Sequence, residues 1–192
     1  RNTFDRFNGR HQDYQAARPS YAQEFLDWLG ELYAPPERYT AADIGSGTGK
    51  LSAQLLAAGF RVCGVEPNPD MRGAAEALLG GDPRFSSSNG TDHDTGLPDR
   101  SVDMVAAAQA FHWFDGPAFA RECRRILRPG GRAVLVWNVR GSAPMNQALA
   151  QVFREHCPSF HGFTGGMGED DPRIRDFFGG AYEKRRFPNP LT

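Results

Sequence analysis

The chain has 192 residues, of which 40% are hydrophobic, and a formal net charge of −1. This length corresponds to about one domain with a substantial core. The charge balance argues against a nucleic-acid-binding protein, and no apolar stretch is long enough to span a membrane. The three cysteines (Cys63, Cys123, Cys157) are odd in number and lack metal-ligand spacing. This cysteine spacing leads us to expect no bound metal. Since no signal peptide is recognisable, we expect a cytoplasmic protein with reduced thiols.

Residues 1–38 form the first predicted segment. Aromatic residues and arginines are frequent up to Arg18, and apolar residues then recur at helical spacing from Phe25 to Leu29. This pattern predicts a helix, with Ser20 as its N-terminal cap. We therefore divide the chain into an N-terminal segment, residues 1–38, and a main domain, residues 39–192.

A glycine-rich turn at residues 43–50 connects a predicted strand, residues 39–42, to a predicted helix, residues 51–58. Its glycines alternate (Gly45, Gly47, Gly49), which permits positive φ angles and lets a ligand lie directly over the backbone. The helix N-terminus offers free N–H groups and a partial positive charge, which suit an anionic ligand group. A dinucleotide-binding turn has the spacing G-x-G-x-x-G instead. For this motif alone, an ordinary strand-to-helix turn is the alternative.

Glu66 ends the next predicted strand, residues 61–65, immediately before Pro67. In a βαβ unit, an acidic residue at this place lies beside a ribose, where its carboxylate can accept hydrogen bonds from both hydroxyls. A plain exposed residue at a strand end is the alternative. The position of Glu66 relative to the glycine turn favours the ribose interpretation.

The remaining predicted strands are residues 84–88, 102–108, 132–138 and 182–187, with helices predicted at residues 73–79, 117–127 and 144–156. Ligand sites of open α/β sheets lie outside the carboxyl ends of the strands. We therefore place residues 109–115, which follow the apolar strand 102–108, at such a site. His112 lies there among three aromatic residues, which is unusual for a plain core. A core histidine with satisfied hydrogen bonds is the alternative.

Together these motifs resemble the class I S-adenosylmethionine-dependent methyltransferases. The matching residues are 42–49, 64–67, 96–98, 101–103 and 127–131, in the family's order. The resemblance implies an α/β fold with a three-layer, Rossmann-like, mostly parallel sheet and an N-terminal helical lid over the cofactor. The family's sheet ends in an antiparallel pair. Because residues 182–187 are the one strand predicted there, we expect an incomplete antiparallel edge.

The resemblance also implies S-adenosyl-L-methionine as the cofactor and assigns residues to its site. The implied cofactor-binding residues are Asp43, Gly45, Ser46, Gly47, Gly49, Glu66, Pro67, Asp92, His93 and Gln109. Asp92 and His93 lie in a polar loop as neighbours of the adenine, although His93 by itself fits a solvated loop histidine better. The implied substrate-binding residues are Tyr14, Arg18, His112, Trp113 and Asn138. Arg18 is placed to meet a carboxylate, and simple packing is the alternative for Tyr14 and Arg18.

Residues 111–115, with Leu127 and residues 136–137, resemble the branch related to trans-aconitate methyltransferases, which esterify small carboxylic acids. We therefore predict methyl transfer to a small-molecule acceptor, with a carboxylic acid as the first candidate. A carboxylate is already ionised and needs no base. A hydroxyl or an acidic carbon does, and His112 is the predicted catalytic residue for that case.

Two alternatives from other functional classes stay open. One is a nicotinamide-dependent oxidoreductase, which the glycine spacing disfavours. The other is a methyltransferase-like scaffold that binds the cofactor without catalysis. The sequence leaves the oligomeric state open.

Overall fold

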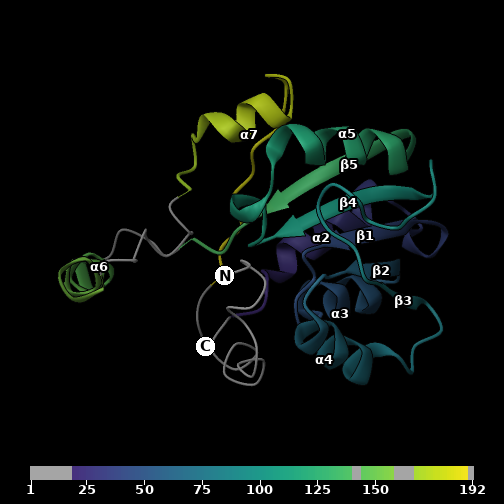
Figure 1. Cartoon of the computed structure of the whole chain (residues 1–192), viewed down its shortest axis with the longest axis horizontal. Coiled ribbons are helices and arrows are strands. Elements are labelled where there is room, and N and C mark those ends of the chain that lie inside the picture. Colours follow the sequence, from purple (N-terminus) through teal and green to yellow (C-terminus); the bar gives the residue numbers. More distant parts are fainter. Residues whose placement is uncertain (1–18, 140–143, 158–166, 190–192) are drawn as a thin grey trace.

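Five parallel strands form a single sheet at the centre of the protein (Figure 1). The computed structural model describes residues 19–139, 144–157 and 167–189. The strand order is β3–β2–β1–β4–β5, so the order reverses between β1 and β4. The strands are β1 Thr40–Ile44, β2 Arg61–Val65, β3 Phe85–Ser88, β4 Val102–Ala108 and β5 Leu127–Val136. The predicted Rossmann-like α/β fold is confirmed.

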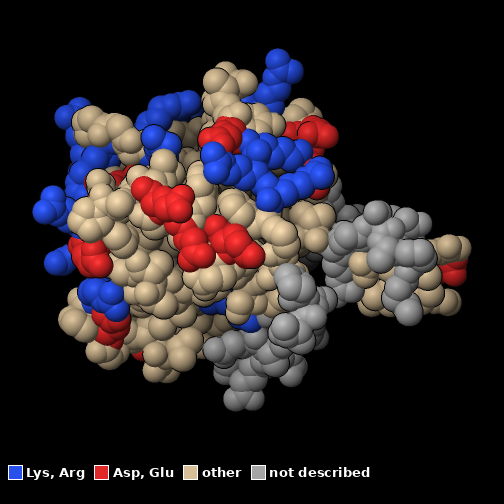
Figure 2. All heavy atoms as spheres, turned by 180° about the vertical axis from the view of Figure 1, so that it is seen from behind, with Lys and Arg blue, Asp and Glu red and all other residues tan. Residues whose placement is uncertain are grey.

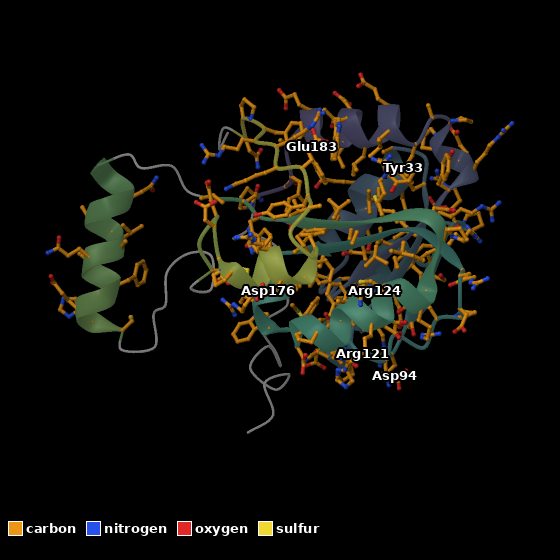
Figure 3. The ribbon with its side chains drawn as sticks, turned by 90° about the horizontal axis from the view of Figure 1, so that it is seen from above. Tyr33, Asp94, Arg121, Arg124, Asp176 and Glu183 are labelled. Atoms are coloured by element: carbon orange, nitrogen blue, oxygen red, sulfur yellow. The ribbon has the colours of Figure 1, made fainter. Side chains whose placement is uncertain are left out.

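Helices cover both faces of the sheet (Figures 1 and 3). One face carries α2 (Gln23–Leu32), α3 (Lys50–Ala57) and α4 (Pro69–Leu79), and the other carries α5 (Gly116–Ile126) and α7 (Pro172–Phe177). Two short 3-10 helices are η2 (Pro36–Arg38) and η3 (Phe111–Trp113). Helix α6 (Pro144–His156) stands apart from these layers in both views. Among the described elements, the three-layer arrangement is therefore α2–α3–α4, sheet, α5–α7.

The central strands β1, β2 and β4 are mostly buried and apolar on both sides because each faces a layer of helices. In β1, Ala41 packs with Leu29 and Leu55 on the α2–α3 face, whereas Ala42 packs with Phe119 and the rest of the α5–α7 face. Successive residues of a strand point to opposite faces, which explains this alternation. The sheet thus separates two hydrophobic clusters, one on each side.

Local capping sets where two of the helices begin. The side chain of Asn68 accepts hydrogen bonds from the N–H groups of Asp70 and Met71, at 3.0 Å each, and starts α4. The side chain of Asp115 accepts from the N–H group of Ala118 at 3.0 Å and starts α5. Each cap satisfies N–H groups that the first helical turn leaves without partners.

The strand predicted at residues 132–138 is β5, which begins earlier, at Leu127, and ends at Val136. Two other predicted features are absent from the structure. Ser20 does not cap α2, which begins after Ala22 without a side-chain cap. Residues 182–187 form no strand. Phe187 instead packs against the rings of Phe25 and Trp28 in α2, at centroid distances of 5.8 and 6.0 Å. Burial of this aromatic ring on a helix decides the path of the segment, in place of backbone pairing at a sheet edge.

The predicted boundary at residue 38 separates α2 from the sheet, but the two share one core. Leu29 is 1% exposed and belongs to the same hydrophobic cluster as Met104 of β4. Residues 1–18, on which the lid prediction depends, lie outside the described residues.

Basic and acidic side chains are intermixed over the face of the molecule shown in Figure 2. Several pair near the carboxyl end of the described chain, where Lys184 contacts Asp170 at 3.1 Å and Arg186 contacts Glu169. None of the described helices is both long and apolar enough to cross a membrane.

Candidate cofactor and acceptor site

The glycine turn after β1 is shaped by three left-handed residues. Gly45, Gly47 and Gly49 have φ angles of 69°, 57° and 81°, which L-residues with a side chain rarely adopt. A Cβ atom at Gly45 would lie 2.8 Å from Cβ of Ala110, and one at Gly49 would lie 2.9 Å from Cδ1 of Leu79. At Gly47 the nearest atom would be 3.7 Å away. Gly45 and Gly49 therefore allow close packing of the protein, whereas a Cβ atom at Gly47 would make only an ordinary van der Waals contact with Met71.

Asp43 lies beneath this turn and is 1% exposed. Its Oδ2 atom accepts a hydrogen bond from the Ser52 hydroxyl at 2.7 Å, whereas its buried Oδ1 atom has no hydrogen-bond partner among the described groups. Burial raises the pKa of Asp43 to about 6, against the opposing hydrogen bonds from Ser52. No sequence pattern pointed to Ser52, because its contact with Asp43 depends on how α3 is rotated against the sheet.

Glu66 joins the ends of β1 and β2. Its carboxylate accepts hydrogen bonds from the N–H groups of Gly47 and Asn68, each at 2.9 Å. Burial raises the pKa of Glu66, and those two hydrogen bonds act in the opposite direction. The structure thus places the predicted ribose carboxylate directly beside Gly47, the one glycine of the turn against which the protein does not pack tightly. Next to Glu66, the Pro67 carbonyl accepts a hydrogen bond from Arg72 at 3.3 Å.

The two predicted adenine neighbours differ in their surroundings. Asp92 is held at both carboxylate oxygens: Oδ1 lies 3.1 Å from Nδ1 of His93, and Oδ2 accepts from the N–H group of Asp115 at 2.9 Å. The His93 side chain is 59% exposed, whereas that of Asp92 is 12% exposed. Asp92 therefore links the loop after β3 to the start of α5, and His93 lies at the surface.

The chain after β4 contacts the glycine turn across the point where the strand order reverses. Besides Ala110, the ring of Phe114 would lie 3.2 Å from a Cβ atom at Gly45. His112 packs against Trp113 with their ring centroids 4.8 Å apart, and Trp113 is 49% exposed. Phe111, in contrast, is buried among other aromatic rings of the α5–α7 face. The structure thus brings the segment that carries His112 next to the glycine turn.

Gln109 and Asn138 form a bridge at the ends of β4 and β5. Gln109 has a φ angle of 55°, and its side-chain amide donates to the Asn138 carbonyl at 3.2 Å. The Asn138 side-chain amide donates to the carbonyls of Pro19 and Ser20, each at 3.3 Å, and accepts from Asn189 at 2.8 Å. The observed contacts of the Asn138 side chain are with segments that are distant in the sequence. Its predicted contact with the methyl acceptor stays a prediction.

Some predicted residues are not tested by this geometry. Tyr14 and Arg18 lie outside the described residues. Ser46 belongs to the glycine turn, where its hydroxyl would lie 3.1 Å from a Cβ atom at Gly64 of β2. Within the described ranges, no group of three or more His, Cys, Asp or Glu side chains is arranged to hold a metal ion.

Comparison with known proteins places this arrangement in a family. Residues 42–135 match the family model described as methyltransferase domain. An uncharacterized methyltransferase of Mycobacterium tuberculosis is 42% identical over 127 residues, which is 66% of this chain and 49% of that protein. The chain spans about half the length of the curated relatives that it matches.

Solved structures agree with the sequence matches. A candidate type II methyltransferase of Anaeromyxobacter dehalogenans is 33% identical with a TM-score of 0.58, over 91% of this chain and 69% of that one. A candidate methyltransferase from an antibiotic biosynthesis pathway of Anabaena variabilis is 25% identical with a TM-score of 0.64. That match covers 83% of this chain and 61% of the other. These relatives favour a methyltransferase over an oxidoreductase.

The described residues fit S-adenosyl-L-methionine, the methyl donor of this family. A Cβ atom at Gly47 would have no described neighbour closer than 3.7 Å, so the protein does not pack tightly against this glycine. An ionised carboxylate has about four acceptor positions, and the N–H groups of Gly47 and Asn68 occupy two of those of Glu66. Capacity for two ribose hydroxyls therefore remains. The motifs, the sheet order and these relatives agree, and the chain belongs to the class I S-adenosylmethionine-dependent methyltransferases.

Proposed function

We propose that this protein transfers a methyl group from S-adenosyl-L-methionine to a small carboxylic acid. The observation that carries the proposal is the contact between the glycine turn and the segment after β4, at Gly45, Ala110 and Phe114. It joins the predicted cofactor turn to the predicted acceptor segment at the point where open α/β sheets bind ligands. The predicted similarity to trans-aconitate methyltransferases supports a carboxylic acid as the acceptor.

The backbone of Gln109 supports a functional role for the same region. A left-handed conformation is uncommon for a residue with a long side chain, yet Gln109 adopts it directly at the end of β4. Such strained residues cluster at binding and catalytic sites, where surrounding contacts hold them. Here the Gln109 N–H group donates to the Val136 carbonyl at 2.8 Å, and its side chain reaches Asn138.

The proposed chemistry asks little of the protein's own acids and bases. The bound cofactor supplies a sulfonium methyl group, which passes to the acceptor by in-line displacement while the sulfur keeps the bonding electron pair. A carboxylate acceptor is ionised near neutral pH, so no proton has to be removed. The residues of the chain orient the acceptor and exclude water. In this scheme His112 hydrogen-bonds to the acceptor, and the aromatic rings beside it provide an apolar wall.

The test combines ligand binding with product detection on the full chain. Calorimetric titrations with S-adenosylmethionine, S-adenosylhomocysteine and NAD establish the cofactor. Mass spectrometry then follows transfer of a labelled methyl group to a panel of small mono-, di- and tricarboxylic acids. Each acid is paired with its amide, which has a similar shape but no carboxylate. We expect binding of both sulfur compounds, no binding of NAD, and methyl esters from at least one acid but not from its amide.

The alternatives give different results. Binding of S-adenosylhomocysteine without transfer to any acid of the panel, or to other small molecules, indicates a non-catalytic scaffold. Transfer to a hydroxyl or carbon atom contradicts the carboxylic-acid acceptor but keeps the methyltransferase. Glu66→Gln is the control variant. Because it is expected to weaken cofactor binding at the proposed site, the amount of methylated product formed there should fall together with the cofactor affinity.

A further inference from the structure

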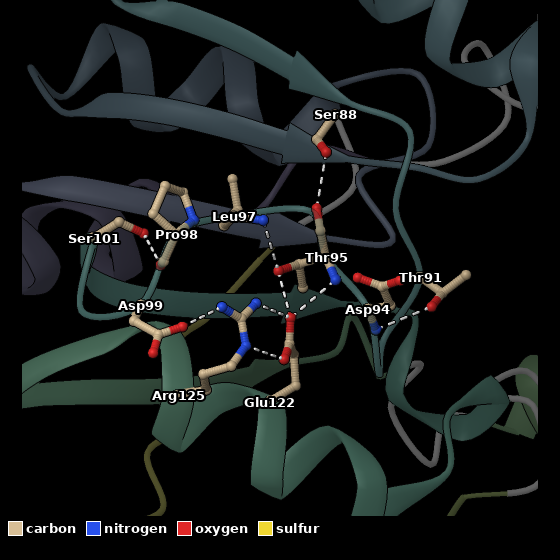
Figure 4. A network of polar contacts seen from close by, with 10 residues as sticks. All are labelled: Ser88, Thr91, Asp94, Thr95, Leu97, Pro98, Asp99, Ser101, Glu122 and Arg125. Carbon is tan, nitrogen blue, oxygen red and sulfur yellow. Dashed lines mark hydrogen bonds and ion pairs between the residues drawn. The ribbon is translucent and has the colours of Figure 1, made fainter.

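Glu122 is a buried carboxylate in α5, on a helix face that otherwise carries apolar side chains such as Phe119 and Cys123. It is 6% exposed. Its Oε1 atom accepts hydrogen bonds from the Thr95 N–H group at 2.9 Å, the Thr95 hydroxyl at 2.6 Å and Arg125 at 2.7 Å (Figure 4). Its Oε2 atom accepts a second bond from Arg125 at 2.8 Å. A buried charge is tolerated when it is paired in this way.

The network keeps Glu122 ionised. Burial raises its pKa, but the hydrogen bonds from Arg125 and Thr95 outweigh burial and lower the pKa to about 2. Arg125 is itself held by Asp99 at 2.6 Å. Glu122 therefore remains a charged acceptor throughout the neutral pH range.

Thr95 connects this charge to the loop after β3. It is fully buried, and its carbonyl accepts a hydrogen bond from the Ser88 hydroxyl at the end of β3, at 2.8 Å. A Cβ atom at Gly90 would lie 2.5 Å from the same carbonyl. The two ends of the loop thus meet at Thr95. Between them, the Thr91 N–H group donates to the Asp94 carbonyl at 2.8 Å and closes a turn.

That turn carries Asp92, the residue predicted to lie beside the adenine. Helix α5 holds the loop at two places: the Asp115 N–H group donates to Asp92, and Glu122 accepts from Thr95. Asp115 is the N-cap residue of α5, and Glu122 lies within the helix seven residues later, so the start of α5 and its middle both contact this loop. The path from Glu122 to Asp92 consists of short hydrogen bonds and one closed turn.

We propose that Glu122 is a positioning residue that holds residues 90–95, and with them Asp92, where the adenine of the cofactor is recognised. The proposal rests on the proposed cofactor site. Glu122 acts through Thr95 and does not itself contact the ligand. It differs from a residue that merely stabilises the fold, because its loss affects recognition of one part of the cofactor more than the rest.

The test compares two ligands that differ at the adenine alone. S-adenosylhomocysteine carries a 6-amino group, which can donate a hydrogen bond to a carboxylate. S-inosylhomocysteine carries an oxygen at that position and cannot. Calorimetry with the unmodified chain is expected to show about tenfold tighter binding of the adenine compound. In Glu122→Gln only one side-chain oxygen remains as an acceptor, so the neutral amide cannot accept hydrogen bonds from both Thr95 and Arg125 as the carboxylate does. We expect the affinity for S-adenosylhomocysteine to fall about tenfold, while that for S-inosylhomocysteine changes less than about threefold.

Further variants separate positioning from general damage. Thr95→Ser keeps the hydroxyl and is expected to preserve discrimination, whereas Thr95→Val removes it and is expected to reproduce most of the Glu122→Gln loss. Thr95→Val also keeps the proposal testable if Glu122→Gln does not fold. Asp82→Asn is the matched control, because Asp82 also pairs with an arginine at both oxygens, but ahead of β3. It is expected to leave both affinities within about twofold.

A ligand-free measurement distinguishes failure of this inference from failure of the proposed function. Amide hydrogen exchange in Glu122→Gln is expected to accelerate at residues 91–95 and to stay unchanged in the glycine turn. If this occurs but the unmodified chain binds neither ligand, the proposed function is wrong and the loop is still held by Glu122. Unchanged exchange, or an equal fall in affinity for both ligands in folded Glu122→Gln, overturns the positioning role.

Discussion

The two sides of the candidate site are assembled in different ways. On the cofactor side, the contacts join residues close in the sequence: Ser52 to Asp43, and Gly47 and Asn68 to Glu66. On the acceptor side, Asn138 alone contacts Pro19, Ser20 and Asn189, which lie 119, 118 and 51 residues away. One side is a local βαβ unit, whereas the other is closed by segments from distant parts of the chain.

This difference explains why residue spacing predicts the contacts on the cofactor side but not the contacts that Asn138 makes on the acceptor side. A short connection keeps the turn, helix and strand of a βαβ unit in a fixed relation, so residue spacing predicts contact. Contacts between distant segments depend on the path of everything between them. We therefore expect substitutions on the cofactor side to act on one ligand, and those on the acceptor side to change turnover or selectivity.

The largest expected effect is that of Gly47→Val. A branched side chain at a φ angle of 57° is strained, and it would project from the turn beside Glu66, where we propose that the ribose binds. Calorimetry is expected to detect no cofactor binding, while the free energy of unfolding falls by about 1–3 kcal/mol. Gly73→Ala is the matched control, because a Cβ atom there meets no atom within 4 Å. Binding that survives in Gly47→Val would place the cofactor elsewhere.

The second prediction concerns Asp43 and pH. Its folded pKa of about 6 lies above the ordinary value of 3.8, so between these values the native state holds a proton that the unfolded state has released. Stability therefore decreases as pH rises from about 4 to 6, by roughly 3 kcal/mol at 1.36 kcal/mol per pKa unit. Urea titrations should show this decrease relative to Asp43→Asn. Parallel pH profiles for the two proteins would contradict the buried, partly unpaired state of Asp43.

Glu66→Ala tests the ribose contact. Loss of hydrogen bonds to a charged group costs about 1.5–3 kcal/mol, so we expect cofactor affinity to fall at least tenfold. The variant also loses stability, because the N–H groups of Gly47 and Asn68 lose their acceptor, and circular dichroism has to confirm that it is folded. Glu76→Ala, which removes a half-exposed carboxylate from α4, controls for the change in charge. Equal affinities in the two variants would refute the assignment.

His112→Gln is expected to have the smallest effect and to sharpen the contrast between the two sides. With a carboxylic acid as acceptor, glutamine can still hydrogen-bond to it, so most of the turnover and nearly all of the cofactor affinity should remain. A loss of about 10²–10⁴ in kcat would show that His112 acts as a general base and that the acceptor is a hydroxyl or an acidic carbon. A collapse of cofactor affinity would instead assign His112 to the cofactor or the core.

The sequence by itself determined the central strands of the sheet and the position of the glycine turn. Residues 61–65 and 102–108 were predicted as strands with the observed bounds of β2 and β4, because buried parallel strands are short apolar runs between strong turn signals. The alternating glycines and Glu66 were likewise identifiable from spacing. Their predicted ligand contacts stay predictions.

Tertiary structure decided the rest. The strand expected at residues 132–138 begins instead at Leu127, and Phe187 packs on α2 where another strand was expected. Gly45 against Ala110 and Thr95 against Glu122 are contacts that no local pattern encodes. Such contacts arise when helices and loops from distant positions pack on the two faces of one sheet, and burial of their side chains, not local preference, selects the arrangement.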